Sequence, residues 1–193
     1  MQPLIQKVLQ DSIALREKLL ADPEIQSLIE QLSLACVDVL KHGGKILFCG
    51  NGGSAADAQH LAAELSGRFA YDRAPLASEA LHVNSSFLTA VANDYSFEEA
   101  YARMVKAIGT RHDILIALST SGNSPNIIKA LKAAKETGLI TAGFSGATGG
   151  LMAAACDYLI RVPSQETPRI QEVHITLGHI LCEFIESSLF PKK

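Results

Sequence analysis

The sequence predicts an α/β protein: a three-layer αβα domain with a central parallel sheet of about five strands, flanked by helices and preceded by N-terminal helices. Three observations predict this class. Short apolar segments alternate with longer segments of helical periodicity along the 193 residues. Most of the apolar segments are continuous, which is typical of parallel strands buried on both faces. Hydrophobic residues make up 48% of the chain and aromatic residues only 6%, which suits a core of Ala, Leu, Ile and Val.

Two amphipathic helices open the chain, and strands then alternate with helices. The first helix should end near Asp22-Pro23 and the second at His42-Gly43-Gly44, where glycine and proline interrupt the helical pattern. HDILIALST is the clearest strand, since it is continuously apolar and ends in hydroxyls. The predicted strands are 45–50, 76–83, 112–120, 139–146 and 157–164. The predicted helices are 3–20, 24–42, 55–69, a short helix reaching Asn93-Asp94, 97–108, 125–137, a short helix around 150–155, and 168–189.

A parallel sheet with right-handed crossovers places all strand-to-helix loops along one edge. Ligands of open α/β sheets bind at that carboxyl edge. The loops 50–54, 84–86, 119–124 and 145–150 are therefore the candidates for a binding site.

Composition excludes several partners. The net charge is −3 with the signs interspersed, so we expect neither nucleic acid nor a membrane surface as a partner. The first 20 residues alternate polar and apolar positions, which argues against a signal peptide or a transmembrane span. The four cysteines are isolated within apolar segments, and we expect them to be reduced core thiols of a cytoplasmic protein.

The loop STSGNSPN (119–126) is a candidate phosphate site. Ser124 is a good N-cap and Pro125 a good first helical residue. Four hydroxyls, those of Ser119, Thr120, Ser121 and Ser124, surround this helix start, where the helix dipole favours negative charge. An ordinary serine-rich turn is the alternative, but the position at a carboxyl edge favours a phosphate monoester.

The loop GNGGSA (50–55) allows a second close approach to a ligand through Asn51, Gly52 and Gly53. Ser54 and Asp57 fit a capping box, with Ser54 as the cap, and we assign Asp57 that role alone. The loop also matches the dinucleotide fingerprint G-x-G-x-x-A. That motif expects an acid at the end of the next strand, which here reads His82-Val83-Asn84, so we set the nucleotide aside.

Two helices carry imidazoles in apolar surroundings. His60 and Glu64 share one face of the helix that begins at the first loop. On the final helix, His174 is expected to be a hydrogen-bonded core residue, whereas His179 lies beside Gly178, which leaves room for a ligand. His60, Glu64 and His179 together would form a site suited to zinc or a similar divalent metal.

Gln171 lies on the same final helix but is harder to place at that metal. Eight residues of helix rise about 12 Å. Gln171 and His179 can therefore share a cation only if it sits between them or if they come from different subunits.

With these motifs in view, the chain resembles the phosphoheptose isomerases of the sugar isomerase (SIS) domain superfamily over nearly its whole length. The resemblance is carried by CGNGGSAADAQHLAAEL, AVANDYSFEE, ALSTSGNSPNIIKAL and the stretch RIQEVHI-x₃-HILC. It implies a single SIS domain over residues 1–193, with 1–42 as an oligomerising helical segment and 43–193 as the α/β core. It also implies a homotetramer with active sites at subunit interfaces and one Zn²⁺ per subunit.

The resemblance further implies isomerisation of sedoheptulose 7-phosphate to D-glycero-D-manno-heptose 7-phosphate, the first step towards the heptose of lipopolysaccharide or capsule. Glu64 and His179 would be the catalytic acid–base residues. The implied metal ligands are His60, Glu64, Gln171 and His179. The implied substrate contacts are Asn51, Gly52, Gly53, Glu64, Arg68, Asn93, Asp94, Ser119, Thr120, Ser121, Ser124 and Gln171.

Two departures from the family pattern concern the choice of sugar. The chain has His82-Val83-Asn84-Ser85-Ser86 where the family usually reads T-T-D-T-S, and Ala102-Arg103-Met104-Val105 where it reads S-R-Q-V. Three alternatives to the heptose isomerase remain: a non-catalytic SIS tetramer that binds the replication initiator, a sugar-phosphate sensor, and an isomerase of another ketose phosphate. The first two do not need Glu64 and His179 as a pair, so their presence favours an enzyme.

Overall fold

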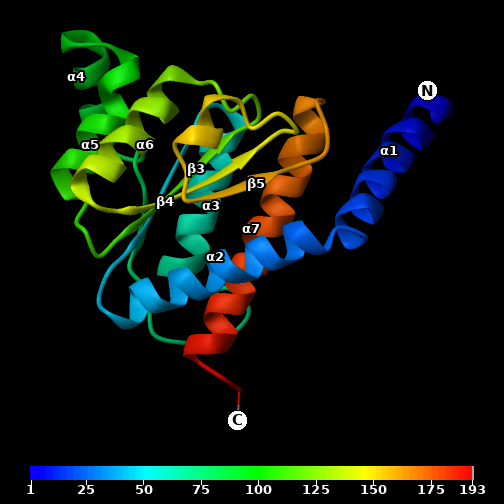
Figure 1. Ribbon diagram of the computed structural model, residues 1–193, viewed down its shortest axis with the longest axis horizontal. Coiled ribbons are helices and arrows are strands. Elements are labelled where there is room, and N and C mark those ends of the chain that lie inside the picture. The colour runs from blue at the N-terminus through cyan, green and yellow to red at the C-terminus, as the bar shows by residue number, and fades with distance from the viewer. Residues whose placement is uncertain (193) are drawn as a thin grey trace.

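The structure is a computed structural model that describes residues 1–192. A five-stranded, all-parallel sheet in the order β2-β1-β3-β4-β5 forms its centre, with helices on both faces (Figure 1). The predicted fold class is confirmed. The helices are α1 (Gln2–Leu20), α2 (Pro23–Lys41), α3 (Gly53–Ser66), α4 (Ser85–Asp94), α5 (Ala100–Ile108), α6 (Pro125–Thr137) and α7 (Thr167–Leu189), with 3₁₀ turns η1 (Phe97–Glu99) and η2 (Gly150–Ala154). The strands are β1 (Ile46–Gly50), β2 (Ser78–Ala80), β3 (Ile114–Ser119), β4 (Ile140–Ser145) and β5 (Tyr158–Arg161).

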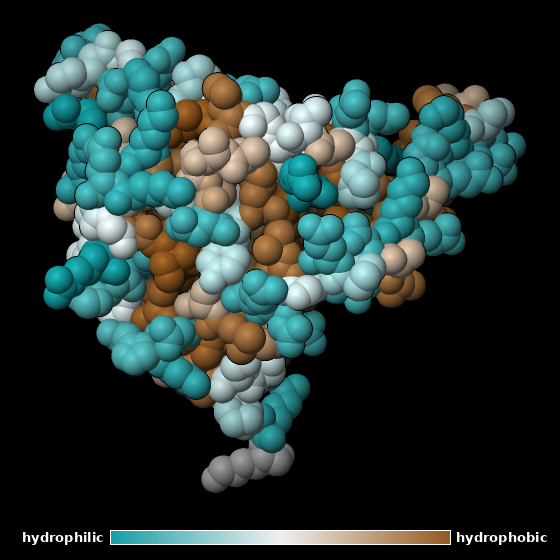
Figure 2. Space-filling view, in the orientation of Figure 1, coloured by the Kyte–Doolittle hydropathy of each residue, from teal (hydrophilic) through white to brown (hydrophobic). Residues whose placement is uncertain are grey.

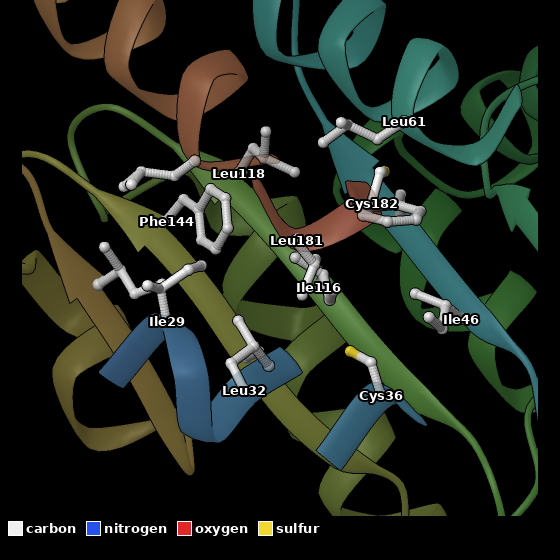
Figure 3. Close-up of a cluster of buried hydrophobic side chains, with 14 of the residues drawn as sticks. Ile29, Leu32, Cys36, Ile46, Leu61, Ile116, Leu118, Phe144, Leu181 and Cys182 are labelled. Carbon is white, nitrogen blue, oxygen red and sulfur yellow. The ribbon is translucent and has the colours of Figure 1, made fainter. Parts of the chain in front are cut away.

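The sheet separates two apolar layers because successive side chains of a strand point to opposite faces. On β1, Ile46 and Phe48 join the layer formed with α2, α3 and α7, whereas Leu47 and Cys49 join the layer formed with α5 and α6. Figure 3 shows the first layer, where side chains of α2, α3 and α7 meet those of β3 and β4. Every residue of β1 and β3 is buried, as the continuous apolar runs predicted.

The predicted capping box at the start of α3 is wrong. The helix begins at Gly53, with Gly52 as its N-cap at φ +55°, and no side chain in the described part of the chain caps it. Ser54 therefore lies inside the first turn, and Asp57 does not serve the cap. The helix also ends at Ser66, three residues before the predicted end at Phe69. The glycines at positions 52 and 53 allow a tighter entry into the helix than a serine cap would give.

The strand and helix boundaries differ elsewhere at the edges of the sheet. The predicted strand 76–83 is reduced to β2, and the strand 157–164 to β5, both of which are edge strands. The predicted helix 97–108 is divided into η1 and α5, and the short helix near 150–155 is the 3₁₀ turn η2. At both edges of the sheet the apolar sequence extends beyond the residues that pair with a neighbouring strand, so the predicted strands were too long.

Helix α1 extends away from the rest of the molecule (Figure 1) and exposes apolar side chains, among them Leu4, Ile5, Leu9 and Ile13. Figure 2 shows that hydrophilic side chains cover much of α1 on one face, with apolar surface at its margins. An apolar groove of about 440 Å³ lies between the end of α1, the start of α2 and α7. Arg169 holds α1 to the start of α7 through the Val8 carbonyl.

Histidine 174 is a core residue, as predicted. It is fully buried, and its Nε2 lies 3.2 Å from the Ser145 carbonyl oxygen, to which it donates, while Nδ1 has no partner among residues 1–192. Burial lowers the pKa of His174 to about 4, although the hydrogen bond to Ser145 opposes the shift. The ring is therefore neutral at ordinary pH.

The cysteines are free, and three of the four are buried. Burial raises the pKa of the Cys182 thiol to about 12 and that of Cys156 to about 12. No helix within residues 1–192 is long and apolar enough to cross a membrane.

Candidate active site

The serine loop folds into a cluster of hydroxyls at the end of β3. Ser119 Oγ lies 3.1 Å from Ser124 Oγ and 3.5 Å from Ser121 Oγ. Ser124 is the N-cap residue of α6 and Pro125 begins the helix, both as predicted. The Ser124 hydroxyl does not cap the helix, however, because it pairs with Ser119 instead. This leaves the hydroxyl cluster beside the positive end of the α6 dipole, which favours an anion.

Gly122 is required by the turn that presents these hydroxyls. Its φ is +66°, and a Cβ there would lie 2.2 Å from the Gly149 carbonyl oxygen. The loop 145–150 thus packs directly against the serine loop. Glycine is the residue that fits both the backbone angle and the close contact.

A small cavity of about 190 Å³ opens in front of the hydroxyl cluster. Residues from three segments line it: the first loop, the serine loop and the start of α7. Its lining residues are Asn51, Ser54, Leu118, Ser119, Thr120, Ser124, Thr167 and Gln171. The predicted contacts Asn51, Ser119, Thr120, Ser124 and Gln171 are therefore brought together here.

Sequence reasoning missed Ser54 and Thr167 as lining residues of this cavity. Ser54 had been assigned to a cap, and Thr167 precedes Pro168 at the start of α7, where a hydroxyl at a helix N-terminus is a usable signal. Gly53 lies close to α7, whereas the prediction for its glycine-rich loop concerned a close approach to a ligand. A Cβ at Gly53 would lie 2.7 Å from Nε2 of Gln171.

Asn126 is another residue that sequence reasoning missed. Its side-chain amide forms two reciprocal hydrogen bonds with the amide of Asn51, with N–O distances of 2.9 and 2.8 Å. It is 3% exposed and sits in the first turn of α6. This amide pair fixes the first loop to the serine loop, which is 75 residues away in the chain.

The second cluster of candidate residues lies further along α3 and α7. His60 Nε2 is 2.9 Å from His179 Nε2 and 3.3 Å from Glu64 Oε1. The side chain of His60 is 48% exposed and that of Glu64 is 23% exposed, so the cluster is open to a ligand or a neighbouring chain. The sequence correctly predicted that these three groups would meet.

Gly178 makes this meeting possible. A Cβ at Gly178 would lie 2.6 Å from Leu61 Cδ1, so glycine lets α7 approach α3 closely at the level of the imidazoles. Gly53 contacts Gln171 in the same way near the starts of the two helices. The helices therefore run in parallel, with the hydroxyl cavity at their N-terminal ends.

Asp57 lies near the imidazoles of His60 and His179 and does not cap a helix. It precedes His60 by three residues, a spacing that places both on one face of α3. Burial raises the pKa of its carboxyl, and the charges of His60 and His179 act in the opposite direction. The i, i+3 spacing was the signal that could have identified Asp57.

The donor set of this cluster fits a borderline divalent cation, because two imidazole nitrogens and one carboxylate oxygen converge. The two imidazoles contact each other directly, and no group of three or more His, Cys, Asp or Glu side chains in residues 1–192 has the geometry of a preformed metal centre. Gln171 lies at the hydroxyl cavity, about 12 Å along α7 from His179. Within one chain the cluster therefore offers three donors, and Gln171 is not among them.

Three predicted contacts lie apart from both clusters. Arg68 is exposed just beyond the end of α3. Asn93 and Asp94 are exposed at the end of α4, where the Asn93 amide donates to Asp94 Oδ1 at 2.9 Å. Asn84 caps α4 by accepting from the Phe87 N–H. The single chain therefore does not bring Arg68, Asn93 or Asp94 to the cavity.

The chain is a SIS-domain protein, since a SIS domain family model matches residues 10–146. A phosphoheptose isomerase from Aneurinibacillus thermoaerophilus is 52% identical over 193 residues, covering 100% of this chain and 98% of that protein. The solved phosphoheptose isomerase from Neisseria gonorrhoeae is 41% identical with a TM-score of 0.88, covering 95% of this chain and 98% of its own. The solved phosphoheptose isomerase from Francisella tularensis is 34% identical with a TM-score of 0.92, and the match covers 96% of this chain and 97% of that one. The chain belongs to the phosphoheptose isomerase family of SIS-domain proteins.

Proposed function

We infer that this protein is an aldose–ketose isomerase that converts sedoheptulose 7-phosphate to D-glycero-D-manno-heptose 7-phosphate. The family supports this reaction, since relatives that share about half of all residues are phosphoheptose isomerases. The contact of His60, Glu64 and His179 is the observation that carries the catalytic assignment, because a non-catalytic SIS protein has no need of it. The replication-initiator and sensor alternatives are therefore not favoured.

The reaction moves one proton from C1 to C2 and a second proton between the two oxygens, through an enediol. In our proposal Glu64 takes the proton from C1 and returns it to C2. His179 transfers the proton between O2 and O1, for which an imidazole is suited at neutral pH. The hydroxyls of Ser119, Thr120, Ser121 and Ser124 hold the phosphate, which fixes the far end of the open-chain sugar.

We propose one Zn²⁺ per subunit, held by His60, Glu64 and His179, with Gln171 as a further ligand. Such a cation supplies polarisation of the carbonyl and stabilisation of oxyanion charge, typically worth several kcal/mol. A carboxylate that both binds a metal and removes a proton needs one oxygen for each task. Glu64 Oε1 faces His60 and would bind the metal, which leaves the other oxygen for the proton.

We propose a homotetramer in which each active site combines residues of two subunits. Gln171 lines the hydroxyl cavity and lies too far along α7 to join His179 of its own chain. The open imidazole cluster of one subunit would therefore face the cavity of another. The apolar face of α1 and the adjoining groove, both within or next to residues 1–42, support oligomerisation through that segment.

We also propose that the enzyme acts in the cytoplasm, where free thiols persist. Its product would enter the route to the ADP-heptose or GDP-heptose precursors of lipopolysaccharide or capsule. Arg68, Asn93 and Asp94 would contact the sugar only within the assembled tetramer, together with Asn51, Gly52 and Gly53.

Incubation of the purified protein and Zn²⁺ with a panel of ketose phosphates in D₂O tests the reaction. We expect the heptulose phosphate to give the aldose with deuterium at C2, because the base exchanges its proton with solvent before returning it. Mass spectrometry and NMR identify the product and the labelled position. Binding of the sugar phosphates without any aldose product would contradict the enzyme assignment.

Co-expression of two inactive variants tests the shared active site. One carries Glu64→Gln, and the other carries Ser119→Ala with Ser124→Ala. If each site combines Glu64 of one subunit with the serine loop of another, mixed tetramers should regain about a quarter of wild-type activity. In random assembly, about one site in four receives both the intact Glu64 and the intact serines. The control is a mixture of the separately purified variants. Co-expressed protein no more active than that mixture would place every site within one chain.

A further inference from the structure

A buried ion pair lies next to the imidazole cluster and has no role in the chemistry described above. Arg73 Nε donates to Glu186 Oε1 at 3.0 Å, and both side chains are 1% exposed. Arg73 belongs to the segment that follows α3, and Glu186 lies on α7, 113 residues later. A buried pair of this kind is poor evidence for stability alone, because desolvation offsets its Coulombic gain.

Glu186 fixes the backbone just beyond α3. Its carboxylate accepts the Phe69 N–H at 3.0 Å and the Ala70 N–H at 2.8 Å. Burial would raise the pKa of Glu186, but the N–H groups of Ala70 and Phe69 and the Arg73 guanidinium hold it below its ordinary range. Glu186 is thus a carboxylate that ties this segment to α7.

Arg73 fixes the end of α3 itself. Its Nη2 donates to the Glu64 carbonyl at 2.9 Å, and its Nη1 donates to the carbonyls of Leu65 at 2.8 Å and Gly67 at 3.0 Å. The carbonyls of Glu64 and Leu65 belong to the last helical turn, where intrahelical donors are lacking, and Gly67 is the C-cap residue. The guanidinium therefore holds the backbone of the proposed catalytic base.

The same pair places an aromatic ring on the second catalytic group. The Phe69 ring lies 5.7 Å from the His179 ring, centroid to centroid, and His179 in turn contacts His60. Glu186 follows His179 by seven residues, or about two helical turns, so both lie on the same side of α7. One ion pair thus anchors the backbone of Glu64 and the ring that packs against His179.

We propose that Arg73 and Glu186 are positioning residues for the isomerase reaction, holding Glu64 directly and His179 through Phe69. This inference rests on the proposed function. The pair contacts no residue of the hydroxyl cavity, so it sets the geometry of proton transfer without setting phosphate affinity. Displacements of about 1 Å at a catalytic group can cost a hundredfold in rate.

Glu186→Gln tests the proposal, with Asp113→Asn as the matched control. Asp113 is also a buried carboxylate, 1% exposed, and it accepts from Lys45 and from the Thr110 N–H at the start of β3, away from both clusters. Each change replaces by an amide a buried carboxylate that pairs with a cationic side chain. The measurements are kcat, KM, inorganic phosphate binding and the thermal unfolding midpoint.

We expect Glu186→Gln to lower kcat at least about tenfold while KM and phosphate binding stay within about twofold. Asp113→Asn should lower the unfolding midpoint but leave kcat of the folded protein unchanged. A kcat for Glu186→Gln equal to that of Asp113→Asn would overturn the proposal. Parallel losses of kcat and phosphate binding would also overturn it, because they indicate a general loss of structure.

Phe69→Leu decides the question if Glu186→Gln does not fold. This change keeps both backbone hydrogen bonds to Glu186 and alters only the ring beside His179. We expect a lower kcat with unchanged KM and phosphate binding, and a wild-type kcat would overturn the proposal. Wild-type protein without isomerase activity in the same assay would instead contradict the proposed function.

Discussion

Replacement of Glu64 by glutamine should leave a folded protein that binds sugar phosphate but isomerises it about 10² to 10⁴ times more slowly. The amide has nearly the same size as the carboxylate and can still contact His60, which lies 3.3 Å from Glu64 Oε1 in the wild-type protein. It cannot accept the C1 proton. The loss should therefore fall on kcat, with KM little changed.

Glu136→Gln is the matched control for this experiment. Glu136 lies on α6 with its side chain 67% exposed, and it pairs with Lys106 at the surface. The same loss of one carboxylate should leave turnover unchanged there. Near-normal turnover of Glu64→Gln would remove Glu64 as the base, and loss of phosphate binding would show that the substitution damages the site more widely.

Removal of bound metal should lower activity at least about a hundredfold, since charge stabilisation by a divalent cation is worth several kcal/mol. The converging nitrogens of His60 and His179 and the oxygen of Glu64 are the physical basis of this expectation. Dialysis against a chelator, followed by titration with Zn²⁺, measures both the loss and its recovery. Metal content is determined by mass spectrometry at each step.

His60→Asn provides the control for chelation. It removes one imidazole donor but leaves the hydroxyl cavity intact, so we expect lower zinc content and unchanged binding of inorganic phosphate. Full activity in protein verified to be free of metal would eliminate the cation from the mechanism. Recovery with Mg²⁺ as effective as with Zn²⁺ would contradict the nitrogen-rich ligand set.

The parallel sheet and the serine loop could be predicted from sequence because their signals are local. The continuous apolar sequence of β3 predicts burial on both faces of the sheet, and Ser124-Pro125 predicts the start of α6. The meeting of His60 with His179 was also predicted, although they are 119 residues apart, because each lies among small or apolar neighbours on a helix. The amphipathic pattern and the spacing along each helix thus predict which polar side chains face the interior.

The remaining contacts depend on how elements meet in space. Ser54 and Asp57 satisfy the rule for a capping box, yet α3 begins at Gly53 after the positive φ of Gly52, two residues earlier than predicted, and Ser54 lines the cavity. No local pattern marks Asn126 as the partner of Asn51, or Arg73 as the partner of Glu186. The separation of Gln171 from His179 follows from their spacing on one helix, but the placement of Gln171 beside the hydroxyls depends on the register of α3 against α7, which single-residue patterns do not report.

The position of α7 in the chain has a consequence for biosynthesis. This helix covers one face of the sheet, where Leu181 and Cys182 pack with Phe144 and Leu118 (Figure 3), and it follows every strand in sequence. During translation the sheet therefore leaves the ribosome before this helix does. A nascent or prematurely terminated chain would leave the part of this apolar face that α7 covers open to solvent, a target for chaperones and proteases, and would lack the imidazole of His179.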